Sequence, residues 1–167
     1  VDTASETGLN VGMYTELTQR NGRPVLFYHS DLREPLIAAE KEGGEWNKKV
    51  LENGAGFFTD AENCGNTIKV AYSNRTSNEL KIGEYNEEWT SRTLPYQTTS
   101  LDLEMENCNP RILFHSPENG ITYYNGSSKK IRDSRRSRVS LSLGEKPELM
   151  FSDRDANTLF HGYTSNF

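Results

Sequence analysis

Four times the chain repeats a short apolar segment that contains an aromatic ring and ends in serine. The copies are VLFYHS at 25–30, IKVAYS at 68–73, RILFHS at 111–116 and ELMFS at 148–152. Their terminal serines, Ser30, Ser73, Ser116 and Ser152, recur with a period of about 43 residues, the last interval being shorter. A period in this range predicts a repeat architecture, because each unit leaves an apolar face that only a neighbouring unit can cover.

Each copy of this segment is flanked by further short segments of strand character. Related stretches precede it at 13–22, 56–65, 101–110 and 139–148, and others follow it at 36–40, 80–84, 121–125 and 159–163. Three units add a fourth stretch, which begins at Glu45, Glu88 and Lys130. Four short strands in about 43 residues, separated by turn residues, are typical of a propeller blade.

Both faces of the repeated segment are apolar. Counting back from each serine, one face carries Phe27, Val70, Leu113 and Leu149, and the other carries Tyr28, Ala71, Phe114 and Met150. A strand with two apolar faces is expected where a sheet lies between two other sheets.

These patterns predict a single all-β domain, a small propeller of four blades with four strands each. The repeat units are about 11–54, 55–97, 98–137 and 138–167. The fourth unit ends at Phe167, before an outer strand, and we expect Thr3–Asn10 to supply that strand and close the ring, since an unpaired edge invites aggregation. The alternative is a half-propeller that forms a homodimer with eight blades.

Composition is consistent with a compact domain. The 167 residues carry a net charge of −5, and 34% are hydrophobic, with eight Tyr and seven Phe that argue against disorder. No apolar run reaches the length that a membrane span requires, so we expect no membrane insertion.

The two cysteines and two glycosylation sequons bear on the compartment. Cys64 and Cys108 occupy matching places in the second and third units, in the phrases ENCG and ENCN. They are either bridged or buried as free thiols, because a bridge requires Cα atoms within about 7 Å. The sequons that begin at Asn74 and Asn125 lie in expected turns. Together these features favour a secreted protein.

A Glu followed by a Trp appears after the third segment of the first two units. The stretches are IAAEKEGGEW at 37–46 and KIGEYNEEW at 81–89. The blade pattern and this pair resemble those of the fungal fucose-binding lectins, secreted β-propellers that hold sugars between blades. The resemblance implies a sugar site made by an Arg, a Glu and an aromatic ring. By register, the Arg position is occupied here by Leu26, Lys69, Ile112 and Glu148.

The candidate sugar-binding residues follow from this comparison and from the chemistry of sugars. A pyranose has an apolar C–H face and a rim of hydroxyls, so its site needs an aromatic platform beside fixed donors and acceptors. The second unit offers all three, the first offers a carboxylate and a ring, and the third offers a ring. The candidates are Lys69, Glu84 and Trp89, then Glu40 and Trp46, then Tyr124.

Three other groups of residues suggest different chemistry. Acids on the expected inner strands (Glu16, Asp60, Asp102 and Glu104) are either surface charges or the acid/base pair of a glycan-acting enzyme. Asp153, Asp155 and Asn157 have the spacing of calcium ligands, but they also suit a turn. The cations of Lys129–Arg138 form either a solvated strand or a site for a sulfated or phosphorylated partner.

The sequence therefore predicts a non-catalytic, carbohydrate-binding propeller. The alternatives are a small glycan-acting enzyme that uses the inner-strand carboxylates, and a protein-interaction scaffold with an anionic partner on the basic stretch.

Overall fold

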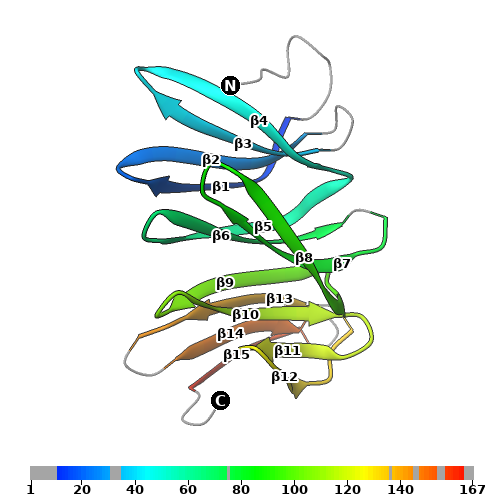
Figure 1. Ribbon diagram of the computed structural model, residues 1–167. Coiled ribbons are helices and arrows are strands. Elements are labelled where there is room, and N and C mark those ends of the chain that lie inside the picture. Colours follow the sequence, from blue (N-terminus) through cyan, green and yellow to red (C-terminus); the bar gives the residue numbers. More distant parts are fainter. Residues whose placement is uncertain are drawn as a thin grey trace. The chain divides into compact units, whose positions relative to one another are not determined.

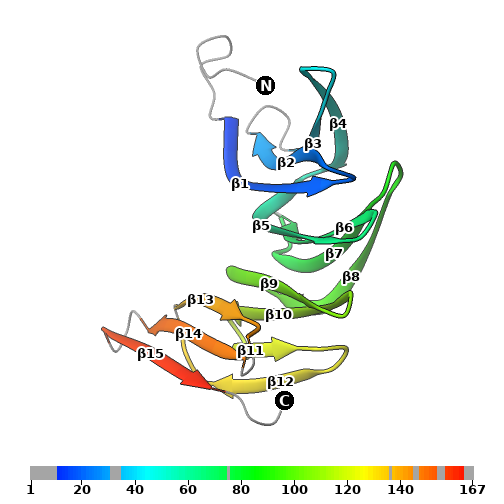
Figure 2. The ribbon, with the colours of Figure 1, turned by 90° about the vertical axis from the view of Figure 1, so that its left-hand side faces the viewer.

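The computed structural model describes residues 11–30, 35–74, 76–135, 137–144, 147–153 and 157–163, and this part of the chain is built from β-strands (Figures 1 and 2). Sheet A contains β1 (Val11–Arg20), β2 (Arg23–Ser30), β3 (Pro35–Glu42) and β4 (Glu45–Asn53). Sheet B contains β5 (Ala55–Cys64), β6 (Thr67–Asn74), β7 (Glu79–Tyr85) and β8 (Trp89–Gln97). Sheet C contains β9 (Ser100–Glu106), β10 (Asn109–Ser116), β11 (Gly120–Tyr124) and β12 (Ser128–Arg132). Sheet D contains β13 (Ser137–Ser142), β14 (Glu148–Asp153) and β15 (Thr158–Tyr163).

The prediction of an all-β fold is confirmed, and so is the division into repeated antiparallel sheets. In each sheet the strands follow one another in chain order, and each sheet falls, to within one residue, inside one repeat unit of the sequence. The segment expected to close the ring, Thr3–Asn10, lies outside the described residues. Among those residues, no helix is long and apolar enough to span a membrane.

The chain divides into two compact units, Val1–Leu94 and Pro95–Phe167. The first unit holds sheet A and most of sheet B, and the second holds sheets C and D. Each unit has its own hydrophobic cluster. The single closed propeller domain stays a prediction.

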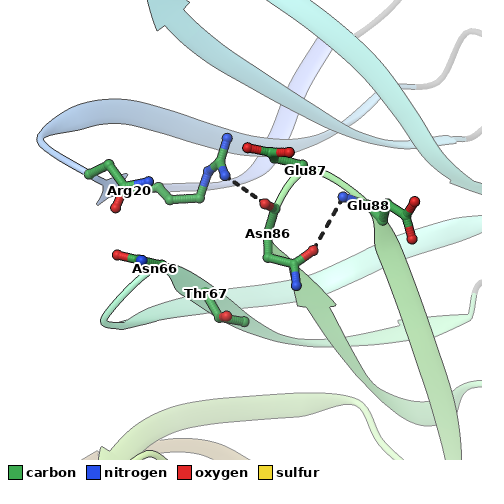
Figure 3. A pocket seen from close by; sticks show the side chains of 7 residues that line it. Arg20, Asn66, Thr67, Asn86, Glu87 and Glu88 are labelled. Atoms are coloured by element: carbon green, nitrogen blue, oxygen red, sulfur yellow. Dashed lines mark hydrogen bonds between the residues drawn. The ribbon is translucent and has the colours of Figure 1, made fainter.

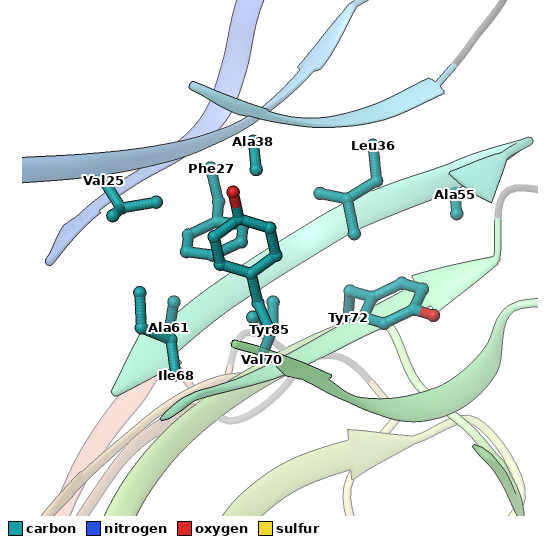
Figure 4. Close-up of a cluster of buried hydrophobic side chains, with 10 residues drawn as sticks. All are labelled: Val25, Phe27, Leu36, Ala38, Ala55, Ala61, Ile68, Val70, Tyr72 and Tyr85. Atoms are coloured by element: carbon teal, nitrogen blue, oxygen red, sulfur yellow. The ribbon is translucent and has the colours of Figure 1, made fainter. Parts of the chain in front are cut away.

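The core of the first unit lies between sheets A and B (Figure 4). Side chains alternate between the two faces of a strand, so one face of β2 sends Val25 and Phe27 into this core. The cluster is made of Val25, Phe27, Leu36, Ala38, Ala55, Ala61, Ile68, Val70, Tyr72 and Tyr85. The other face of sheet A carries a smaller cluster around Tyr28, Ile37 and Ala39. Both faces of the sheet are apolar, as its sequence predicted.

The first strands of sheets A and B, β1 and β5, share a bulge that the sequence did not predict. Gly12 and Gly56 have positive φ, and two residues later Tyr14 and Phe58 also do, each with φ 50°. The pairing register of β1 and β5 shifts at these positions. In β5 the Thr59 hydroxyl donates to the Gly56 carbonyl at 2.8 Å, and the equivalent threonine of β1 makes the same bond. The repeated Gly-x-aromatic-Thr phrase is therefore a bulge motif.

The second unit is held together by apolar packing and by side-chain bonds between sheets C and D. Leu113, Ile121 and Tyr123 of sheet C pack with residues of β13 and β14. On β9, the Asp102 carboxylate accepts the backbone N–H of Leu141 at 2.7 Å. Such a bond satisfies a backbone donor that a sheet edge would otherwise leave open.

The two cysteines are both disulfide-bonded. The sequence contains no other cysteine, so the bridge joins Cys64 to Cys108. Of the two alternatives left open by the sequence, the disulfide is therefore confirmed.

Candidate functional site

The residues predicted to form a sugar site in the second repeat unit do not share one face of sheet B. Lys69 and Glu84 are direct partners in the β6–β7 register and form an ion pair. Their neighbours Val70 and Tyr85 point into the core of the first unit, so this ion pair lies on the opposite face.

Trp89 lies on the core face instead. A Cβ atom built on Gly83 would be 1.9 Å from the Trp89 ring, so the indole covers this glycine directly. The ring also packs against the core cluster, with its centroid 5.8 Å from that of Tyr72. Trp89 therefore contributes to the packing between sheets A and B, and it does not face the Lys69–Glu84 pair.

The two candidates of the first repeat unit, Glu40 and Trp46, also lie on opposite faces of their sheet. Trp46 packs against the smaller cluster of sheet A around Tyr28, and the Lys41 ammonium lies 5.9 Å from its ring centroid. Glu40 is paired with Val25 in the β2–β3 register and shares its core-facing side. The structure therefore separates Glu40 from Trp46.

The remaining predicted site residues have varied surroundings. Tyr124 on β11 is 7% exposed, which leaves little of its ring for a ligand.

Of the three residues with the spacing of calcium ligands, Asp153 is buried and Asn157 is exposed, whereas Asp155 lies outside the described residues. Within the described part of the chain, no group of three His, Cys, Asp or Glu side chains is placed to hold a metal ion.

Two cations of the basic stretch have local partners. The Arg132 guanidinium lies 3.8 Å from the centroid of the Phe160 ring, and Lys130 forms an ion pair with Asp133. Two inner-strand acids are also engaged, because Asp60 accepts the Ala61 N–H at 2.8 Å and Asp102 bonds to β13. These contacts give a local structural role to Arg132, Lys130, Asp60 and Asp102.

A polar pocket of about 490 Å³ lies in the first unit, where three turns of sheets A and B come together (Figure 3). The β1–β2 turn, the β5–β6 turn and the β7–β8 turn each contribute an asparagine and its neighbours. The lining residues are Arg20, Asn21, Asn66, Thr67, Asn86, Glu87 and Glu88. The volume is in the range of about 300–1,000 Å³ that is usual for small-molecule sites.

Arg20 is the anchor of this pocket. Its Nη2 donates to Glu40 Oε2 at 2.8 Å, and its Nη1 donates to the Asn86 carbonyl at 2.7 Å (Figure 3). Its guanidinium carbon lies 5.4 Å from the centroid of the Tyr85 ring. The two side chains of the ion pair are only 9% and 12% exposed. One arginine thus ties the end of β1 to β3 and to the β7–β8 turn.

Burial and neighbouring charges shift the pKa values of Arg20 and Tyr85. Burial alone lowers the pKa of Arg20, but the hydrogen bond and negative charge of Glu40, together with the interactions of Tyr85 and Glu87, raise it by more, so the net pKa is raised. Burial and then the charge of Glu40 raise the pKa of Tyr85. Arg20 therefore stays cationic and Tyr85 stays neutral near pH 7.

The β7–β8 turn is held in an unusual conformation. Glu87 has a backbone φ of 134°, in a region that residues other than glycine rarely adopt. The Lys49 ammonium donates to the Glu87 carbonyl at 2.7 Å, and the Glu88 N–H donates to Asn86 Oδ1 at 3.3 Å. With the bond from Arg20, these contacts hold the strained turn that lines the pocket.

Most polar side chains that line the pocket have no partner in the described part of the protein. The side chains of Asn21, Asn66, Thr67, Glu87 and Glu88 form no hydrogen bond or ion pair there. The pocket therefore presents amide and hydroxyl donors beside carboxylate and amide acceptors. Such a set can bind a ligand whose own groups both donate and accept.

Of the predicted site residues that the structure describes, only Glu40 contacts the residues of this pocket, through its bond to Arg20. Sequence analysis missed Arg20 and the three turns. A signal was present, because an asparagine stands in the corresponding turn phrases QRNG at 19–22, CGNT at 64–67 and YNEE at 85–88. Turn residues of this kind are usually explained by backbone conformation alone, which concealed their convergence.

No protein-family model matches the chain, and a comparison with curated proteins finds no significant match.

Proposed function

We propose that this protein is a non-catalytic carbohydrate-binding protein and that the pocket around Arg20 holds the sugar. The observation that carries the proposal is the group of uncommitted donors and acceptors in a pocket of about 490 Å³. Sugar hydroxyls both donate and accept hydrogen bonds, so they match this mixed lining better than an apolar ligand would.

The way the site is held supports binding in a preformed geometry. Arg20 is bonded to Glu40 and to the β7–β8 turn, so its side chain does not need to be ordered when a ligand arrives. The pocket lining contains no aromatic ring, and Tyr85 is 6% exposed beneath the guanidinium. Polar contacts, rather than stacking, therefore supply most of the proposed affinity.

The hydroxyl of Thr67 offers a conservative test of the site. We expect Thr67→Val to weaken binding of neutral oligosaccharides about tenfold, because valine keeps the shape and strand propensity but removes one hydrogen-bonding group. The measurement is isothermal titration against the oligosaccharide that binds best in a glycan screen. Thr93→Val, at an exposed position of β8 outside the pocket, is the matched control. Equal binding by both variants would exclude Thr67 from the site.

We further propose that the four sheets close into a propeller, with Thr3–Asn10 as the outer strand of the last sheet. Exposed apolar side chains on the outer faces of the first and last sheets support this proposal. Leu17 and Val50 are 61% and 56% exposed on the outer face of sheet A. Leu159 and Tyr163 are 67% and 63% exposed on the outer face of sheet D. Closure would cover apolar surface that otherwise contacts water.

Small-angle scattering distinguishes closure from the alternatives. A closed, compact monomer of this length is expected to have a radius of gyration of about 15 Å. The same sample in light scattering should have the mass of one chain. A dimeric mass would favour the eight-bladed homodimer, and a monomer with a clearly larger radius would contradict closure.

Secretion remains part of the proposal. The Cys64–Cys108 disulfide supports it, because disulfides persist in oxidising compartments and are rare in the cytosol.

A further inference from the structure

The balance of charge at the pocket favours one class of saccharide. The charged groups there are the cations Arg20 and Lys49 and the carboxylates Glu40, Glu87 and Glu88. Arg20 is neutralised by Glu40, with which it forms a nearly buried ion pair. The Lys49 ammonium is bonded to the Glu87 backbone carbonyl and forms no ion pair with a carboxylate. The carboxylates therefore exceed the cations by one.

The two carboxylates that remain belong to neighbouring residues of one strained turn. Glu87 and Glu88 both line the pocket, and neither forms an ion pair within the described residues. The turn itself is held by the bonds from Arg20 and Lys49, so it presents these acids without having to fold around a ligand. A nearby cation on the ligand would interact with two carboxylates that form no hydrogen bond or ion pair within the described residues, one of which, Glu87, also acts by its charge on Arg20.

From this arrangement we infer that the pocket selects saccharides that carry a protonated amine, such as hexosamine units with a free amino group. The inference rests on the proposed carbohydrate-binding function and specifies its ligand class. A protonated amine donates three hydrogen bonds and places its charge beside Glu87 and Glu88. An N-acetylated sugar loses that charge, and a uronate or sulfated sugar is repelled by the excess of carboxylate.

The test compares oligosaccharides of equal length that differ in charge. Tetramers of glucosamine, N-acetylglucosamine and galacturonate are titrated calorimetrically at about pH 6, which lies below the ordinary pKa of an amino group. We expect the glucosamine tetramer to bind about fivefold more tightly than the N-acetylated one, as expected for unit charges near a solvated surface. The galacturonate tetramer should bind most weakly. The preference should decrease when the ionic strength is raised to about 150 mM.

Two variants test whether Glu87 and Glu88 of the β7–β8 turn cause the preference for the glucosamine tetramer. The double variant Glu87→Gln with Glu88→Gln should bind the glucosamine and N-acetylglucosamine tetramers equally, while circular dichroism shows an unchanged fold. Glu118→Gln, an exposed carboxylate of the second unit outside the pocket, should keep the full preference.

The outcomes separate this inference from the function on which it rests. Saccharide binding without a preference for the amine, or tighter binding of galacturonate, would overturn the inference and leave the proposed function standing. A parent protein that binds none of the three tetramers and no member of a broader glycan screen would overturn both. A preference that survives in the double variant would remove Glu87 and Glu88 as its source.

Discussion

Replacing Cys64 and Cys108 with serine is expected to lower the free energy of unfolding by about 4 kcal/mol. The bridge closes a loop of about 45 residues, and cross-linking a loop of this length removes conformational entropy from the unfolded chain. Typical domains are stable by only about 5–15 kcal/mol, so this loss is a large part of the total. The chain has no second disulfide to compensate for it.

Urea denaturation of the two forms, followed by tryptophan fluorescence and by circular dichroism, measures the change. The parent protein in a reductant should show the same loss as the double serine variant, and the variant should not respond to the reductant. An unchanged urea midpoint in the variant would contradict the expected contribution of the disulfide.

The second large effect is expected at the Arg20–Glu40 pair. Glu40→Leu should lower the free energy of unfolding by about 3 kcal/mol, because it leaves the guanidinium nearly buried without its counter-ion. The double variant Arg20→Met with Glu40→Leu should recover most of this loss, since replacing a buried ion pair with apolar side chains is often neutral. A double-mutant cycle from urea denaturation gives the coupling between the two positions.

Binding measurements on the same variants distinguish the structural role of the pair from its role in the site. The double variant should fold but lose measurable saccharide binding, because the β7–β8 turn then lacks its bond from Arg20. Replacement of the exposed Arg23–Glu42 pair by the same two residue types is the matched control, and it should change stability by less than about 1 kcal/mol. Normal saccharide binding by the folded Arg20→Met with Glu40→Leu variant would argue against the proposed site.

Much of the local architecture could be derived from the chain because it depends on short-range alternation. The period of the serine-ended segments located the sheets, since each sheet falls, to within one residue, inside one repeat unit. The two apolar faces around Phe27 and Tyr28 predicted clusters on both sides of sheet A. The repeat did not reveal the bulges at Gly12 and Gly56, because a bulge inserts a residue and interrupts the alternation from which strands are predicted.

The candidate site was predicted less well, for a physical reason that Trp89 illustrates. The sequence places Glu84 and Trp89 close together, but the β7–β8 turn with its positive φ at Glu87 separates them. A change of one residue in strand register moves a side chain to the other face of a sheet. Spacing within the sequence therefore could not show that Trp89 covers Gly83 on the core face.

Strand alternation and the repeat period are properties of contiguous residues, so they could be obtained from the chain alone. They established the all-β class, the succession of antiparallel sheets and the apolar character of both sheet faces. The convergence of Arg20, Glu40 and Asn86 joins residues that are far apart in the sequence. Arg20 and Glu40 meet across sheet A, and only the packing of sheet A against sheet B brings the Asn86 carbonyl within hydrogen-bonding distance of Arg20, and with it the turns that line the pocket. The pocket is thus a consequence of tertiary structure, because contacts between the turns of different sheets have no periodic signature in the sequence.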